Sequence, residues 1–82
     1  MKGDLPMEKM LELLRSIRND IDFEKETTLV DDGILDSFDI VAIVAELCDA
    51  YDITISIDEM EAENFNSAQA MLALVERLQD NL

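Results

Sequence analysis

Apolar residues recur at the spacing of one helix face in three segments of this chain, and this periodicity restricts its fold more than any other feature. The segments run from about Pro6 to Arg18, from about Ser37 to Tyr51 and from about Ser67 to Gln79. Positions three and four residues apart share one side of an α-helix, so each segment predicts an amphipathic helix. The predicted buried faces are Met7, Met10, Leu11, Leu14 and Ile17, then Ile40, Ile43, Val44, Leu47 and Tyr51 (flanked by Val41 and Cys48), and last Ala68, Met71, Leu72, Val75 and Leu78.

Residues that favour helix ends stand at the limits of the first two segments. Pro6 suits a first helical turn, in which its missing N–H is not needed. Arg18 falls in the last turn of that helix, where the helix dipole favours a cation. Asp36 is a good N-cap for the second helix, and Asp39 adds an anion to the first turn of the same helix.

The connection between these helices, residues 19–35, is long but does not have the composition of a plain linker. Its Asp, Thr and Gly residues favour turns, and we expect Gly33 to adopt a backbone angle that other residues resist. Apolar residues nevertheless recur along it, so we expect the loop to wrap the core. The expected anchors are Ile21, Phe23, Leu29, Val30, Ile34 and Leu35.

The stretch after the second helix predicts extended chain and then a short helix. The sequence ITISI alternates apolar and polar residues but has no partner strand, so we expect a loop. Its isoleucines expected to touch the core are Ile53, Ile55 and Ile57. A third helix from Asp58 to Glu63 would be capped by Asp58, and the last helix by Asn66 or Ser67. The pattern predicts an all-α four-helix bundle, with three main helices, one short helix and a long first loop, in a single domain over residues 1–82.

The charge balance disfavours several classes of function. The chain has 20 Asp and Glu against 6 Lys and Arg, a formal net charge of −14. This charge opposes binding to nucleic-acid phosphates and to an anionic membrane surface. With no His, a His-based triad or metal site is impossible. The acids of residues 31–39 lack the spacing of an EF-hand, so we expect no metal site.

The remaining composition indicates a cytoplasmic protein. No apolar run approaches the roughly 18 residues of a membrane span, so no membrane insertion is expected. Residues 1–10 do not read as a secretory leader. The single cysteine, Cys48, excludes an internal disulfide, and its place beside an apolar stripe predicts a residue at the core boundary rather than a thioester site.

The segment 31–39, DDGILDSFD, is the strongest candidate for chemistry. It places Ser37 in the first turn of a helix, where free N–H groups and the helix dipole favour an anion such as a phosphate ester. No nearby base can activate Ser37, so we interpret it as a substrate of another enzyme and expect no catalytic residue in the chain. Taken by itself, the Asp36-Ser37 pair also fits a simple helix cap.

In this context the chain resembles the phosphopantetheine-dependent acyl carrier proteins. The resembling segments are 32–38 (DGILDSF) with the apolar helix that follows, 51–55 (YDITI) and 63–67 (ENFNS). The resemblance covers nearly the whole chain, from about Met7 to Leu78.

The resemblance implies that Ser37 carries a 4'-phosphopantetheine arm, which would make the chain a phosphoprotein. A phosphopantetheinyl transferase would move the arm from coenzyme A with Mg²⁺, and the arm's thiol would carry an acyl or aminoacyl group as a thioester. A loading ligase and a downstream transferase or synthase with basic patches would be the other partners. A monomer suits such a shuttle, whose flexible arm raises the local concentration of its cargo.

The acidic surface then suggests how partners are recognised, because opposite charges speed and orient encounters. The candidate recognition residues are Asp36, Phe38, Asp39, Glu46, Asp49, Glu59 and Glu61. Each of these acids also fits an ordinary solvated surface. A function from another class stays open as well, that of an unmodified acidic helical adaptor that binds a basic protein.

Some residues depart from the carriers of fatty-acid synthesis. Phe38 follows the serine where those carriers usually have Leu, and Ala42, Cys48 and Ala50 stand where acids are expected. The entry to the last helix is more similar to D-alanyl, polyketide or peptidyl carriers. The resemblance therefore favours a dedicated pathway, such as lipid or polyketide biosynthesis, and leaves the cargo open.

Overall fold

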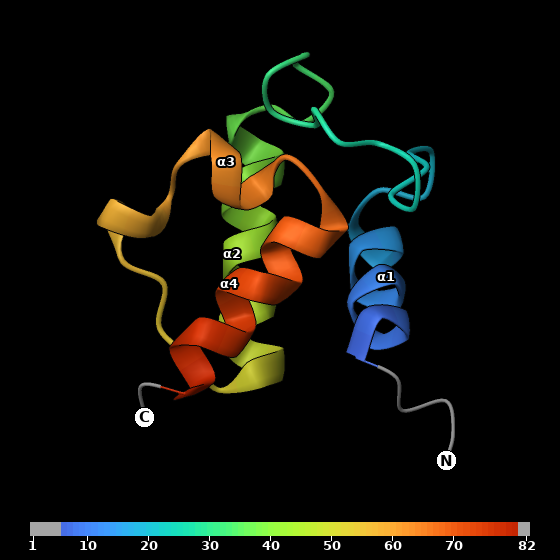
Figure 1. Cartoon of the computed structure of the whole chain (residues 1–82). Helices are drawn as coiled ribbons and strands as arrows, with labels where there is room; N and C mark the ends of the chain where they lie inside the picture. The colour runs from blue at the N-terminus through green and yellow to red at the C-terminus, as the bar shows by residue number, and fades with distance from the viewer. Residues whose placement is uncertain (1–5, 81–82) are drawn as a thin grey trace.

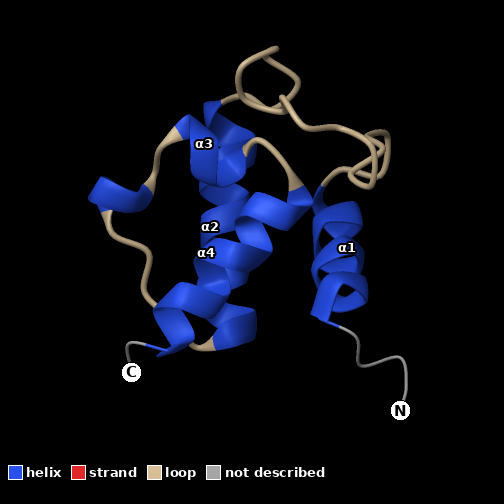
Figure 2. Cartoon of the chain, in the orientation of Figure 1, coloured by secondary structure: helices blue, strands red, loops and turns tan. Residues whose placement is uncertain are grey.

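The computed structural model describes residues 6–80, and these residues fold into helices joined by loops (Figure 1). The elements are α1 (Pro6–Ile17), α2 (Ser37–Tyr51), the 3₁₀ turn η1 (Ile57–Glu59), α3 (Ala62–Phe65) and α4 (Ala68–Asp80). Figure 2 shows no strand in this part of the chain. The all-α fold is confirmed. A single domain over residues 1–82 stays a prediction, because residues 1–5 and 81–82 lie outside the described residues.

The long first loop links the ends of two antiparallel helices. In the view of Figure 1, α1 runs upward, the loop crosses the top of the molecule, and α2 and α4 run downward. Helix α4 packs against α1, α2 and α3, and α1 also packs against α2. The start of α2 therefore lies at the loop end of the bundle, where α1 ends.

The predicted helix faces form the core. Met10, Leu11 and Leu14 of α1 are buried, as are Ile43 and Leu47 of α2 and Ala68, Met71 and Val75 of α4, while the other predicted face residues pack partly buried around them. Leu74 is also fully buried, which the sequence interpretation missed. Helix α4 has neighbours on three sides, so its buried face is wider than a single stripe.

The loop anchors are confirmed as well. Phe23 and Leu29 are fully buried, Ile21 and Leu35 are nearly so, and Val30 and Ile34 pack partly buried against the same core. Gly33 has a φ of +72°, in the left-handed region that other residues disfavour. A Cβ at this glycine would contact nothing within 4 Å, so the cost of replacing it comes from the backbone conformation alone.

The expected short helix from Asp58 to Glu63 was wrong in its form. The chain makes the 3₁₀ turn η1, leaves helical geometry at Met60 and Glu61, and only then forms α3. The residue before η1 is Ser56, not Asp58, and its N–H donates to the Glu59 carboxylate over 3.0 Å. A serine followed three residues later by a glutamate is a strong helix-start signal, and it begins the turn earlier than expected.

The expected core contact of Ile57 was also wrong. Ile53 and Ile55 are buried, but Ile57 is 86% exposed. Alternate residues of an extended chain face the same side only while the chain stays extended. The 3₁₀ turn begins at Ile57, so the alternation ends there and the side chain faces solvent.

The last helix begins as predicted. The Ser67 hydroxyl accepts a hydrogen bond of 3.0 Å from the Ala70 N–H and so caps α4. No helix between residues 6 and 80 is both long and apolar enough to cross a bilayer.

We expect Leu29→Ala to destabilise the protein by about 2–5 kcal/mol, as a core helix residue would, because its side chain fills the core from the loop. The matched control is Val41→Ala, whose side chain is 60% exposed and whose replacement should change stability by about 0.5 kcal/mol or less. Urea unfolding followed by circular dichroism measures both free energies. Equal stability of the two variants would show that the loop is not part of the core.

Candidate functional site

Ser37 is the first residue of α2, and it is exposed to solvent. Two of the large apolar side chains that follow it on the helix, Phe38 and Val41, are 84% and 60% exposed. An exposed hydroxyl between a loop and a helix is accessible to another protein. The position therefore suits a residue that a partner enzyme modifies.

The turn that presents Ser37 is held by a reciprocal cap, as predicted for Asp36. The Asp36 carboxylate accepts a hydrogen bond of 2.9 Å from the Asp39 N–H, and the Asp39 carboxylate accepts one of 3.2 Å from the Asp36 N–H. The Asp36 carbonyl accepts from the Ile40 N–H over 3.0 Å, which starts the helical ladder. Ser37 and Phe38 lie between the two capping residues, so the cap defines their backbone.

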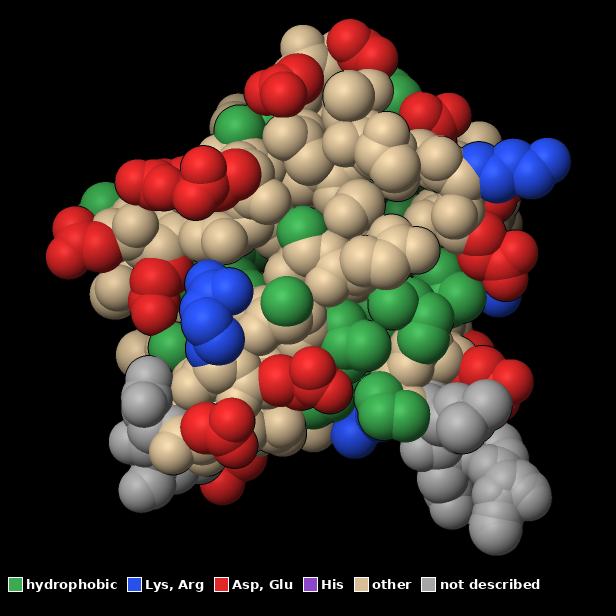
Figure 3. Space-filling model, in the orientation of Figure 1, with side chains coloured by type: hydrophobic (Ala, Val, Ile, Leu, Met, Phe, Trp, Pro, Cys, Tyr) green, Lys and Arg blue, Asp and Glu red, His purple; other side chains and the backbone are tan. Residues whose placement is uncertain are grey.

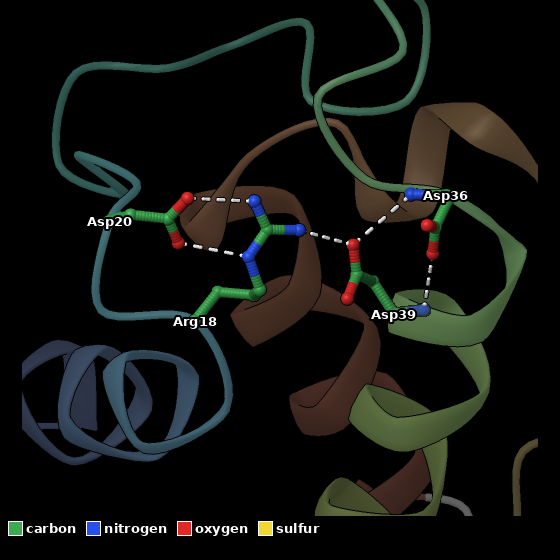
Figure 4. A network of polar contacts seen from close by, with 4 residues as sticks. All are labelled: Arg18, Asp20, Asp36 and Asp39. Carbon is green, nitrogen blue, oxygen red and sulfur yellow. Dashed lines mark hydrogen bonds and ion pairs between the residues drawn. The ribbon is translucent and has the colours of Figure 1, made fainter.

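Arg18 connects this cap to the end of α1 (Figure 4). One terminal nitrogen lies 2.6 Å from Oδ2 of Asp39, the same oxygen that accepts from the Asp36 N–H. The other terminal nitrogen and Nε bind the Asp20 carboxylate at 2.8 and 2.9 Å. Arg18 directly follows Ile17, the last residue of α1, and its N–H donates to the Leu14 carbonyl, in line with its predicted place at the end of that helix. Its side chain also bridges two elements, which the sequence did not reveal.

The contact between Arg18 and Asp20 shifts the pKa of both groups. The hydrogen bond from Arg18 lowers the pKa of the Asp20 carboxyl from its ordinary value of 3.8 to about 2. The same hydrogen bond, together with the nearby carboxylates of Asp20 and Asp39, raises the pKa of Arg18. Arg18 therefore stays charged at neutral pH, and the Asp20 carboxyl is protonated only as the pH falls toward its lowered pKa.

Asn66 attaches the loop before Ser37 to the connection between α3 and α4. Its side-chain oxygen accepts hydrogen bonds from the N–H groups of Val30 and Asp31 at 2.9 and 3.0 Å, and its side-chain nitrogen donates to the Asp31 carboxylate. Its carbonyl accepts from the Leu29 N–H. The sequence analysis considered Asn66 as a cap for the last helix and as part of the ENFNS segment, but not as a partner of the long loop. A contact 35 residues distant in sequence leaves no local signal that could have revealed it.

The candidate recognition residues differ in how free they are. Asp36, Phe38, Glu46, Asp49 and Glu61 are exposed. The Asp39 side chain is only 15% exposed and is paired with Arg18. Glu59 is half-buried and accepts hydrogen bonds from the backbone and hydroxyl of Ser56. Asp36 is exposed, but its carboxylate caps α2, so three of the seven residues, Asp36, Asp39 and Glu59, are engaged within the chain.

The free residues on α2 form a mixed apolar and acidic surface. Phe38, Val41, Ala45 and Asp49 are all exposed and recur three or four residues apart, so they lie on one side of the helix. The sequence interpretation placed Val41 beside the buried stripe and missed its exposure. In the orientation of Figure 3, acidic side chains are spread widely over the visible face of the molecule.

The described residues, 6–80, hold no cluster of His, Cys, Asp and Glu suited to a metal ion. They also enclose no pocket. Cys48 is a half-buried free thiol packed against the core, in line with its predicted place at the core boundary.

Comparison with known proteins agrees with this geometry. A family model described as a phosphopantetheine attachment site matches residues 7–75. A D-alanyl carrier protein of Lactococcus lactis subsp. lactis (strain IL1403) is 35% identical over 63 residues, which are 77% of this chain and 75% of the relative. D-alanyl carrier proteins of subsp. cremoris strains MG1363 and SK11 are each 29% identical over 75 residues, 89% of this chain and 95% of theirs. No solved structure matches the chain.

Proposed function

The chain belongs to the family of carrier proteins with a phosphopantetheine attachment site, and from this premise we propose that Ser37 is the residue that bears the arm. The cofactor of this family is covalently attached 4'-phosphopantetheine, whose terminal thiol holds the cargo as a thioester. The exposure of Ser37 at the start of α2 is the observation that carries the assignment.

The residues around Ser37 fit a phosphate ester. Helix geometry leaves the first N–H groups of α2 without partners within the helix, and the cap engages that of Asp39. The amides of Ser37 and Phe38 and the positive end of the helix dipole remain to favour an anion. The carboxylates of Asp36 and Asp39 oppose it, but Arg18 is paired with Asp39 and offsets part of their charge.

We propose that a separate transferase carries out the attachment. The Ser37 oxygen forms a bond to the phosphorus of coenzyme A that bears the pantetheine arm, and the pyrophosphate P–O bond breaks. Adenosine 3',5'-bisphosphate leaves, and the hydroxyl proton passes to a base of the transferase. The carrier chain supplies the acceptor oxygen, and Mg²⁺ and the base belong to the partner enzyme.

D-alanine is the cargo that the comparisons favour. The relatives from three Lactococcus lactis strains are D-alanyl carrier proteins, and two of them align over nearly their whole length. The ENFNS entry to α4 and the Phe38 after the serine had already favoured carriers outside fatty-acid synthesis. A ligase would join the D-alanine carboxylate to AMP from ATP, with release of pyrophosphate, and then transfer the D-alanyl group to the arm's thiol, with release of AMP. A cytoplasmic location and a monomeric state stay predictions.

We further propose that partners dock on the exposed side of α2 that bears Phe38, Val41 and Asp49, with Glu46 beside it. Acids next to exposed apolar side chains suit a partner surface with basic residues around an apolar socket. No Lys or Arg occurs between Glu26 and Glu76, so no neighbouring cation in this stretch weakens the field. Rim charges of this kind mainly set the rate of encounter, which suits a carrier that must leave each partner quickly.

Incubation with coenzyme A, Mg²⁺ and a broad-specificity phosphopantetheinyl transferase should add one phosphopantetheine, and Ser37→Ala should abolish the addition. Intact-mass spectrometry measures it. The matched control is Ser56→Ala, another exposed serine at the start of a helical turn, which should leave the addition unchanged. No addition to the wild type with several transferases would favour the unmodified acidic adaptor instead.

The modified protein should gain one D-alanyl group when it is incubated with ATP, Mg²⁺, D-alanine and a D-alanine-activating ligase. The bond should be a thioester, so neutral hydroxylamine should release the group, and intact mass follows both steps. L-alanine and Ser37→Ala serve as controls and should give no adduct. Loading by a fatty-acyl ligase but not by the D-alanine ligase would contradict the proposed cargo.

Charge reversal at Glu46→Lys should slow phosphopantetheine transfer severalfold at low salt, with a smaller effect at high salt, because the contact is electrostatic. The matched control is Glu12→Lys. Glu12 is an exposed acid on α1, outside the proposed docking surface on α2, and its reversal changes the net charge by the same amount. Initial rates over a salt series measure the effect. Equal rates for the two variants would remove Glu46 from the docking surface.

A further inference from the structure

We infer that Arg18 is a positioning residue for the modification of Ser37, because it holds the turn that presents the Ser37 hydroxyl. The inference rests on the proposed function of Ser37. It concerns a residue that lies 19 positions earlier in the chain, outside the attachment segment and beyond the end of another helix.

Arg18 is held in one orientation by contacts of its backbone and its side chain. Its backbone N–H donates to the Leu14 carbonyl over 3.0 Å, which fixes it to the last turn of α1. Its guanidinium binds the Asp20 carboxylate with two nitrogens, and this orients the group. The remaining terminal nitrogen then points to Asp39 at 2.6 Å (Figure 4). The Arg18 and Asp39 side chains are 31% and 15% exposed, so water screens this pair less than an open surface pair.

The contact between Arg18 and Asp39 involves the same carboxylate oxygen that accepts the hydrogen bond of the cap. Oδ2 of Asp39 accepts from Arg18 and from the Asp36 N–H, so the guanidinium orients the carboxylate that closes the turn on one side. The other closing hydrogen bond runs from the Asp39 N–H to Asp36. Ser37 lies between these two residues, so rotation of the Asp39 carboxylate would loosen the backbone of Ser37.

Charge gives a second reason for the contact. Asp36 and Asp39 place two carboxylates in one turn, and the phosphodiester on Ser37 adds a further negative charge. Among the ion pairs within residues 6–80, Arg18 is the cation that meets Asp39. Removal of Arg18 would leave the half-buried Asp39 carboxylate without its partner, beside Asp36.

Two other roles of Arg18 make different predictions. A residue that only stabilises the fold would change the free energy of unfolding but not the rate of modification of folded protein. A residue that contacts the transferase would change mainly the KM for the carrier. Loss of a positive charge would even favour encounter with a basic transferase and lower that KM. A positioning residue changes kcat, because docking is retained while the hydroxyl is misplaced.

The experiment measures kcat and KM for phosphopantetheine transfer to Arg18→Gln and Arg18→Lys, at a temperature at which circular dichroism shows both folded. We expect about a tenfold lower kcat for Arg18→Gln, equivalent to about 1.4 kcal/mol, with a KM that is not raised. Arg18→Lys should recover part of the rate, because a lysine keeps the charge but loses the fork that binds Asp20. The matched control is Arg15→Gln, which removes the same charge from a pair that is longer (3.4 Å) and more exposed, and it should leave kcat unchanged.

Amide hydrogen exchange on the unmodified variants gives a readout that needs no transferase. In Arg18→Gln, the amides of Asp36 and Asp39 should exchange faster, while the core amides of α4 should keep their wild-type protection. Uniformly faster exchange would indicate a general loss of stability and overturn the inference.

The outcomes separate this inference from the function on which it rests. Wild-type protein that accepts no phosphopantetheine would contradict the assignment of Ser37, and with it the role of Arg18 in modification. Normal modification of the wild type together with an unchanged kcat for Arg18→Gln would overturn the inference alone. A raised KM with an unchanged kcat would also overturn it and would instead place Arg18 at the transferase contact.

Discussion

Burial of the long first loop against the helices is the constraint on which the rest of the structure depends. Helices α1, α2 and α4 have 12, 15 and 13 residues, and the chain has no Trp to fill a core. The loop therefore contributes full core residues, of which Phe23 and Leu29 have no exposed surface. Leu35 is buried one residue before the cap of α2. The packing that completes the core thus also decides where Ser37 lies.

The chain carries excess negative charge. At the candidate site, two of the carboxylates are held in place by hydrogen bonds and an ion pair. Most carboxylates of the chain lie on the surface, where they are solvated and available for partners with basic residues. At the start of α2 the two aspartates of the cap lie within one turn, and Arg18 compensates one of them from another element. The same turn holds the Ser37 hydroxyl, which we propose as the attachment point of the arm. One local arrangement of Asp36, Asp39 and Arg18 therefore caps α2, offsets part of the negative charge there and presents the Ser37 hydroxyl.

Much of this could be predicted from sequence because it depends on local rules. The helical period located the three main helices, and Asp36 was found as a cap because a short acceptor side chain at a helix start binds free N–H groups. The loop anchors were found because apolar residues in a turn-rich segment must be buried somewhere. The family was recognised because a short motif, DGILDSF, stands in its expected place in a small acidic helical pattern.

The wrong or incomplete predictions came from local sequence rules, and tertiary packing decides where such rules stop applying. Ile57 continued an alternating pattern, but the chain turned at that residue and exposed it. Leu74 lay off the predicted stripe, but it is fully buried in α4, a helix that packs against three others. Asp39 was considered as a free surface acid, and Arg18 as a cation at a helix end. Neither interpretation could include a contact between residues 21 positions apart.

The sequence by itself determined the helical class, the acidic surface, the position of the cap and the serine that follows it, because each depends on residue type and short-range spacing. Only the tertiary structure decided that the Asp39 carboxylate is paired with Arg18 and that Asn66 holds the loop, because the partners meet only when the core has closed. The physical reason is the range of the interactions. A helix and its cap form within a few residues, whereas an ion pair between two helices exists only where packing brings their ends together.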